Sequence, residues 1–239
     1  MKPELRDDRP DPPPSERNRI LQVYASRRQG DYSFFEPWFL QLCQQRERLL
    51  AVELRRLGVR SLADRRILEV GCGRGHWLRL FNYWGARPED LRGCDINADR
   101  LGEARALHPA IACDLTMGRE LPYQAGSFDL VLQSTVFSSI LDLGMQRELA
   151  GEMLRVLKDH GIIIWYDFRW NNPRNPDVRG LGATAIRGLF PGCRVRLVSV
   201  GLLPPLARRV ARWSSTLSAL LERIPPLRYA YLGLIRKEA

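Results

Sequence analysis

Short apolar runs and helical stretches alternate through the middle of the chain. Runs bounded by glycine or polar residues predict buried strands at 67–70, 91–95, 110–113, 128–132 and 161–167. Apolar positions recur at helical spacing in stretches between them, at 77–84, 98–107 and 145–157. This alternation is typical of an α/β fold in which helices cover both faces of a parallel sheet.

The two flanks of this region carry further helical and strand patterns. Before it, residues 18–57 predict two helices that are interrupted at 31–37. After it, 193–200 and 228–235 predict two more strands, and proline pairs enclose a helical run at 207–223. We therefore divide the chain into a disordered tail at 1–15, which is charged and proline-rich, an N-terminal helical cap at 16–60, and one domain at 61–239 with a helical insertion at 202–227.

Composition limits the class of protein. With 239 residues and 45% hydrophobic content, the chain can bury one large core. Its net charge of +10 favours an anionic partner, but the arginines are spread along the chain, which equally fits a GC-rich genome. The five cysteines include no C-x-x-C pair, and we see neither a signal segment nor a membrane-length apolar run. We therefore expect a cytoplasmic protein with reduced thiols.

The clearest chemical signal follows the first predicted strand, where residues 69–75 read E-V-G-C-G-R-G. Glycine tolerates positive φ and lets a ligand approach the backbone, so a strand, a glycine turn and a helix indicate a nucleotide-type cofactor site. His76 occupies the third small position of the dinucleotide fingerprint, which disfavours an oxidoreductase. The phosphate-binding G-x-x-x-x-G-K-[ST] loop is absent from the sequence.

Three segments together resemble a known family. E-x-G-x-G-x-G, the segment LPYQAGSFDLV at 121–131, and LRVLK at 154–158 followed by Gly161 resemble the methyltransferase type 11 group of class I S-adenosylmethionine (SAM) methyltransferases. Asp159 and His160 replace the proline and glycine usual there. The resemblance covers residues 65–170 and implies a Rossmann-like, mostly parallel seven-stranded sheet with an antiparallel last strand. It also implies SAM as the cofactor, S-adenosylhomocysteine as the product, and no metal.

The resemblance assigns roles to the residues that end the first strands. Asp95 would accept the ribose hydroxyls, Ile96 would pack on the adenine, and Asp114 would meet the adenine amine, although each Asp can also cap a helix. The full set of expected cofactor-binding residues is Glu69, Gly71, Cys72, Gly73, Gly75, Asp95, Ile96, Asp114, Leu115, Gln133 and Ser134, with Tyr24 and Tyr32 as a lid. The alternative for the two tyrosines is packing on the sheet.

The methyl acceptor is less defined by the sequence. His76, Asp167 and Arg169 lie where acceptor groups would reach the methyl, and we take them as candidate catalytic residues. Residues 167–180 resemble a glycan-pathway subgroup, which implies a sugar hydroxyl or another small-molecule acceptor, lipid-linked in some cases. An RNA methyltransferase and a non-catalytic SAM-binding protein stay open as alternatives.

The arginine-faced helical run at 207–223 has three possible roles. It can cap the acceptor pocket, lie on an anionic membrane, or form a dimer face. We favour capping, because the apolar face is short and lacks clustered lysines. The oligomeric state stays open.

Overall fold

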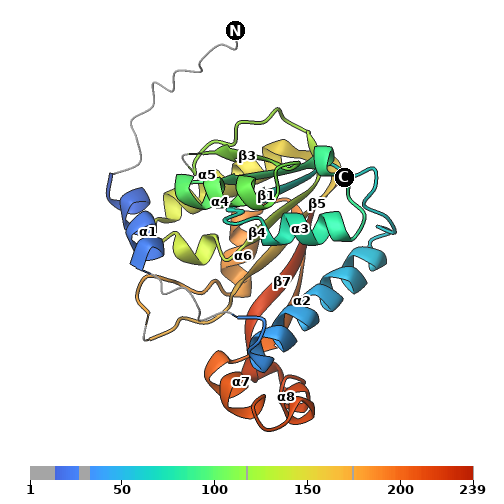
Figure 1. The fold of residues 1–239 in the computed structure, drawn as a ribbon. Coiled ribbons are helices and arrows are strands. Elements are labelled where there is room, and N and C mark those ends of the chain that lie inside the picture. Colours follow the sequence, from blue (N-terminus) through green and yellow to red (C-terminus); the bar gives the residue numbers. More distant parts are fainter. Residues whose placement is uncertain (1–13, 27–32, 117, 174, 239) are drawn as a thin grey trace.

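The computed structural model describes residues 14–26, 33–116, 118–173 and 175–238 (Figure 1). In this part of the chain, seven strands form one sheet in the order β3-β2-β1-β4-β5-β7-β6. Their bounds are β1 Ile67–Val70, β2 Leu91–Asp95, β3 Ala112–Leu115, β4 Phe128–Ser134, β5 Leu157–Phe168, β6 Cys193–Leu202 and β7 Arg228–Lys237. Strands β1 to β5 pair in parallel, and β7 is antiparallel to both β5 and β6. The predicted Rossmann-like sheet with an antiparallel last strand is confirmed.

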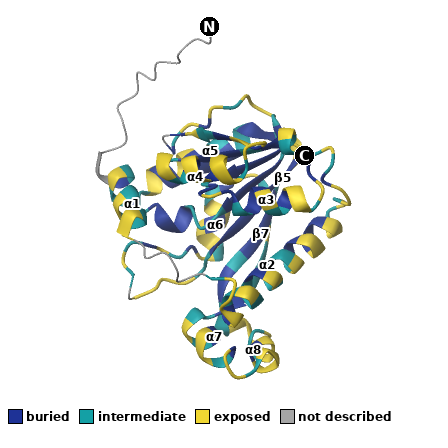
Figure 2. Ribbon diagram, viewed as in Figure 1, coloured by how far each residue is buried: buried dark blue, intermediate teal, exposed yellow. Residues whose placement is uncertain are grey.

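Helices cover both faces of this sheet. The helices are α1 Pro14–Ser26, α2 Pro37–Arg56, α3 His76–Tyr83, α4 Ala98–Leu107, α5 Leu143–Val156, α6 Ala183–Leu189, α7 Pro204–Val210 and α8 Ser215–Leu221. One core cluster joins α2, α3 and α4 to the sheet, and a second joins α1, α5 and α6 to the opposite face. A third, smaller cluster packs α7 against the start of α2 and the end of β6. Figure 2 shows the buried strands between exposed outer helix faces.

The main differences from the expectations concern β3, β5, the helical run at 207–223 and α6. The third strand lies at Ala112–Leu115, two residues later than predicted. In this register Cys113 pairs with Gly93 of β2. The fifth strand begins at Leu157, directly after α5. The predicted helix at 207–223 is two helices, since Ser214 has extended backbone angles and accepts a hydrogen bond from Leu217 N at 3.1 Å, which caps α8. Helix α6 is not predicted, because it is short and buries one residue, Ile186.

The sheet topology defines the edge where a ligand can bind. In open sheets of this kind, ligands bind outside the carboxyl ends of the parallel strands, where the strand order reverses. Here that point lies between β1 and β4. Among the described helices, none combines the length and apolar character needed to cross a bilayer.

Candidate cofactor site

The glycine turn after β1 has a backbone that only glycine adopts readily. Gly71, Gly73 and Gly75 have φ of 70°, 52° and 77°. The amide of Gly71 donates to the carbonyl of Cys94 at 2.7 Å, which ties the turn to β2. A Cβ at Gly71 would lie 2.3 Å from Val136 Cγ2, so the side chain of Val136, in the loop after β4, leaves no room for a side chain at Gly71.

Asp95 ends β2 beside this turn, as predicted. Its buried carboxylate accepts hydrogen bonds from Gly73 N at 2.8 Å on Oδ2 and from Asn97 N at 2.9 Å on Oδ1. These two bonds fix the shape of the turn and the direction of the carboxylate. A carboxylate has about four acceptor positions, so the remaining ones can still take a ligand's hydroxyl groups. Ile96 follows, half-buried against the core cluster of α5.

Glu69 lies beneath the turn, inside β1. It is 2% exposed and accepts a hydrogen bond from Leu78 N at 3.3 Å, within α3. Burial raises the pKa of Glu69 well above its usual range. The carboxyl group thus links β1 to the helix that the glycine turn starts.

The end of β4 carries an unsatisfied polar group. Gln133 is fully buried beside Val70 of β1, and its Oε1 accepts a hydrogen bond from Val136 N at 3.1 Å. Its Nε2 has no partner in the described part of the chain. Ser134 follows at the strand's end, and then Thr135 has a φ of 58°, which is unusual for a β-branched residue. A buried donor and local strain at this edge both fit a polar ligand.

Asp114 lies inside β3 rather than beyond it. It pairs with Cys94, and its Oδ2 accepts a hydrogen bond from Tyr123 OH at 3.0 Å. The hydroxyl of Tyr123 therefore orients this carboxylate. Leu115 ends the strand with about half of its side chain exposed. Cys72, in the glycine turn, is buried.

Tyr24 on α1 lies above the glycine turn. Its ring centroid is 4.7 Å from Arg100 Cζ, and Arg100 Cζ would lie 3.2 Å from a Cβ at Gly73. The hydroxyl of Tyr24 lies 3.3 Å from Ser139 Oγ, in the loop after β4. Tyr24 thus contacts both Arg100, which packs beside the glycine turn, and Ser139 in the loop after β4, an arrangement that fits the lid hypothesis. Tyr32 lies outside the described residues.

The lid hypothesis makes a direct prediction. Replacing Tyr24 by Ala should weaken SAM binding about three- to ten-fold, because the ring loses its contact with Arg100 over the turn. Tyr83→Ala is the matched control, since Tyr83 is 85% exposed at the end of α3. Calorimetric titration of both variants with SAM measures the difference. Equal affinities for the two variants would show that Tyr24 only packs on the domain.

His76 contacts an arginine that the sequence analysis missed. Arg46 on α2 donates from Nη2 to His76 Nε2 at 3.2 Å, because a guanidinium has no acceptor. Burial, with Arg46 and Arg79 nearby, lowers the pKa of His76 to about 4. His76 is therefore neutral at physiological pH, with its proton on Nδ1, and is a weak base. No sequence signal distinguishes Arg46 from the other arginines of its helix.

This low pKa predicts a pH-dependent stability difference. As pH falls from 6.5 to about 4, an unfolded His76 takes up a proton and a folded one does not, so the folded state loses stability. Relative to His76→Gln, the wild type should lose up to roughly 2–3 kcal/mol over this range. The buried Asp167, whose pKa is raised to about 6, has the opposite trend, but it is present in both proteins and cancels. Urea unfolding at several pH values tests this. A constant difference contradicts it.

Asp167 and Arg169 lie at the carboxyl end of β5 and have different surroundings. Asp167 is fully buried and accepts hydrogen bonds from Ser138 N at 3.1 Å and Phe168 N at 2.8 Å. Burial raises its pKa to about 6. Arg169 donates to Pro225 O at 3.1 Å, and its Cζ lies 4.4 Å from the ring centroid of Trp170. Asp167 therefore holds the loop after β4, whereas Arg169 faces the segment before β7.

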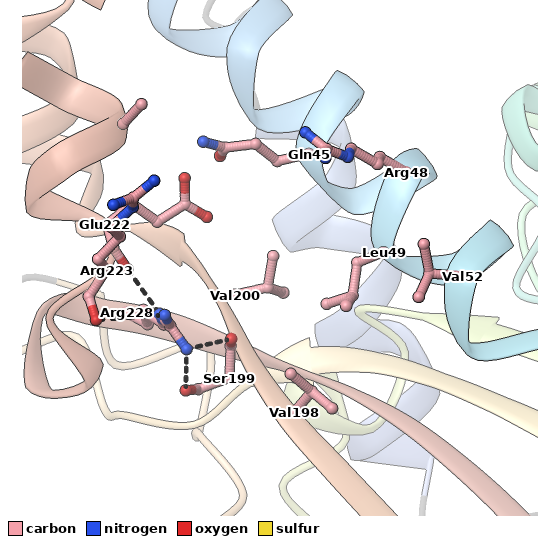
Figure 3. Close-up of a pocket in the computed structure, with 11 residues that line it drawn as sticks. Gln45, Arg48, Leu49, Val52, Val198, Ser199, Val200, Glu222, Arg223 and Arg228 are labelled. Atoms are coloured by element: carbon pink, nitrogen blue, oxygen red, sulfur yellow. Dashed lines mark hydrogen bonds between the residues drawn. The ribbon is translucent and has the colours of Figure 1, made fainter. Parts of the chain in front are cut away.

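A separate pocket lies away from these residues. It measures about 310 Å³ and opens between α2, β6 and α8 (Figure 3), and none of the predicted site residues lines it. In its wall, Arg228 donates from Nη1 to Ser199 O at 3.2 Å and from Nε to Glu222 O at 2.6 Å. These contacts brace the connection between β6 and β7.

Comparison with known proteins identifies the domain. Residues 67–161 match the family model described as a methyltransferase domain. This range contains the glycine turn, Asp95, Asp114 and Gln133. No curated protein matches the chain at a significant level.

Solved structures share the fold over most of the chain. Geranyl diphosphate C-methyltransferase from Streptomyces coelicolor A3(2), in complex with Mg²⁺, geranyl diphosphate and S-adenosyl-L-homocysteine, aligns with a TM-score of 0.63 at 14% identity, over 96% of this chain and 100% of that one. A SAM-dependent methyltransferase from Archaeoglobus fulgidus aligns with 0.55 at 21%, over 81% and 94%. Another from Mesorhizobium loti aligns with 0.54 at 20%, over 77% and 96%. Within the described residues of this chain, no group of three or more His, Cys, Asp or Glu side chains could hold a metal ion.

Proposed function

We propose that this chain, a SAM-dependent methyltransferase by its matched domain and its fold, methylates a hydroxyl group of a glycan or another small-molecule acceptor. The cofactor would bind at the carboxyl edge of β1, β2 and β4. We retain the division into a helical cap at 16–60 and a cofactor domain at 61–239, and a cytoplasmic location, which the free state of all five cysteines supports.

This proposal rests on one observation, that the groups at that edge can still bind a polar ligand. The glycine turn admits a ligand against its backbone, Asp95 has acceptor positions left for a ribose diol, and Gln133 Nε2 is a buried donor without a described partner. A carboxylate of the cofactor's methionine part would satisfy that donor. Burying an amide donor without a partner costs about 1–3 kcal/mol, so a ligand that supplies the acceptor gains affinity.

The chemistry requires positioning more than acid–base groups. When bound, SAM supplies a methyl group on a sulfonium, so that the acceptor oxygen takes the methyl carbon as the carbon–sulfur bond breaks, sulfur keeps the electron pair, and the hydroxyl proton is released. His76 is a weak base, and the buried carboxylate of Asp167 already accepts two backbone hydrogen bonds, so the hydroxyl proton would pass to water and we assign Asp167 a positioning role on the loop after β4. Holding two reactants in line can lower a barrier by about 7 kcal/mol or more.

The acceptor would bind near the residues that follow β5. Trp170 is half-exposed, and its Nε1 donates to Arg228 O at 3.1 Å, so the indole ring is held in place with part of its face open. Arg169 packs on the same ring. A fixed aromatic face beside a cation suits a sugar ring or a phosphorylated sugar. The net charge of +10 also favours RNA as the second candidate acceptor.

Labelled SAM tests the acceptor class. The wild type is incubated with methyl-labelled SAM and, separately, sugar nucleotides, lipid-linked glycans, small phenols and RNA. We expect label in a sugar-containing or phenolic product, as an acid-stable methyl ether. Label in RNA alone would replace our acceptor by the second candidate, and the absence of any product with SAM bound would favour a non-catalytic SAM-binding protein.

A further inference from the structure

The connection between β6 and β7 presents an unusual surface at one end of the molecule. Helices α7 and α8 lie there, beyond the end of the sheet (Figure 1). In α8, Ser218 is 2% exposed, whereas Leu217 and Leu220 are 48% and 51% exposed. The helix therefore buries a serine and exposes two of its three leucines, whereas Leu221 packs against the domain, and packing on the domain alone would not favour two exposed leucines.

Other large apolar side chains extend this surface. Trp213, in the turn between the two helices, is 88% exposed, and Ile224 after α8 is 45% exposed. We use the term docking face for these apolar residues and the arginines of the same connection, namely Trp213, Leu217, Leu220, Ile224, Arg208, Arg209, Arg212 and Arg223. Figure 2 shows exposed positions around both helices.

The docking face is positively charged. The connection contains four arginines and a single acidic residue, Glu222, whose Oε1 accepts a hydrogen bond from Gly201 N at 3.0 Å. Arg208 packs over the ring of Trp38 with Cζ 4.8 Å from its centroid. Arg209, Arg212 and Arg223 are exposed, and no carboxylate of the described residues forms an ion pair with them.

We infer that the docking face binds the surface of an anionic phospholipid bilayer. Arginines attract anionic headgroups, an interfacial tryptophan suits the headgroup level, and the leucines can enter the acyl boundary. RNA would use the arginines but would leave Leu217, Leu220 and Ile224 in water. A second copy of this chain would bring a second set of arginines against the first, which like-charge repulsion opposes.

The docking face lies at the same edge as the candidate site. Strand β6 ends at Leu202 and β7 begins at Arg228, and β7 Ala230 pairs with Phe168 at the carboxyl end of β5. Neighbouring strands are about 4.8 Å apart, so β7 starts roughly 10 Å from β4 along this edge. A bilayer on the docking face would therefore present a lipid-linked acceptor toward the cofactor edge. This last step rests on the proposed function, whereas membrane binding itself does not.

Vesicle flotation tests the electrostatic half of the inference. The full chain is floated with vesicles of phosphatidylcholine alone or with 30% phosphatidylserine, without SAM or acceptor. We expect binding only to the anionic vesicles. Replacing Arg209, Arg212 and Arg223 by Ala should reduce it about 100-fold, at about five-fold per basic residue. The triple variant Arg60→Ala, Arg147→Ala, Arg187→Ala removes equal charge from exposed positions elsewhere and should bind like the wild type.

A second pair of variants tests the apolar half. Trp213→Ala should reduce binding to anionic vesicles at least about ten-fold, because a large side chain leaves the lipid interface. Tyr83→Ala, which removes another exposed aromatic ring, should have no effect. Absence of vesicle binding, equal loss in the control variants, a dimer that Trp213→Ala dissociates, or RNA binding that replaces vesicle binding would each overturn the inference. None of these outcomes depends on methyl transfer.

Discussion

Replacing Gly71 by Ala is expected to weaken SAM binding by about 100-fold or more. The new Cβ would lie 2.3 Å from Val136 Cγ2, and Ala at a φ of 70° is strained by about 1–2 kcal/mol. Both effects push the turn away from the loop after β4, so the backbone that would contact the cofactor moves. Calorimetric titration with SAM measures the loss, and thermal unfolding shows whether the domain still folds.

Two further variants separate the turn from general effects on the domain. Gly151→Ala, in α5, meets no atom within 4 Å and should bind SAM normally while gaining up to about 1 kcal/mol of helix stability. The double variant Gly71→Ala, Val136→Ala relieves the clash but not the positive φ, so affinity should recover only in part. If Gly71→Ala binds SAM within two-fold of the wild type, the turn is not the cofactor cradle.

Replacing Asp95 by Ala is expected to weaken SAM binding at least ten-fold, which is about 1.4 kcal/mol. The carboxylate would lose its bonds to ribose hydroxyls and also to Gly73 N and Asn97 N, which shape the turn. Asp95→Asn keeps one acceptor oxygen and should lose less. Asp99→Ala removes the same charge from an exposed position in the first turn of α4 and should bind normally. Unchanged affinity for Asp95→Ala would remove the ribose-binding assignment.

The sequence predicted those features whose residue types are dictated by backbone chemistry. The glycines of the turn have positive φ because no other residue adopts it readily, so their spacing predicted the position of the turn. Asp95 ends β2 as expected, and the apolar runs gave β1 and β2 to the residue. Strand β3 starts two residues later than predicted because residues 109–110 form a turn, in which Ile111 N donates to His108 O at 3.0 Å. That shift moved Asp114 from the end of a strand to its interior, beside Tyr123.

Features that depend on tertiary contacts were not visible in the sequence. The contact of Arg46 with His76 joins α2 to α3, and no local pattern indicates it. The segment of α7 and α8 was predicted as one continuous helix, because the run has helical periodicity. The cap at Ser214 interrupts it, and this capping contact was not predicted. The preference for acceptor capping rested instead on the short apolar face and the lack of clustered lysines. The exposed Trp213 and Leu220 now favour a membrane surface for that segment.

Titration of the wild type with SAM, with NAD as the competing ligand, directly tests whether this chain has a SAM-binding site. We expect one site per chain, a micromolar dissociation constant, which is about −8 kcal/mol, and no displacement of SAM by NAD. Binding of NAD in preference to SAM, or no binding of SAM at millimolar concentration, would contradict it.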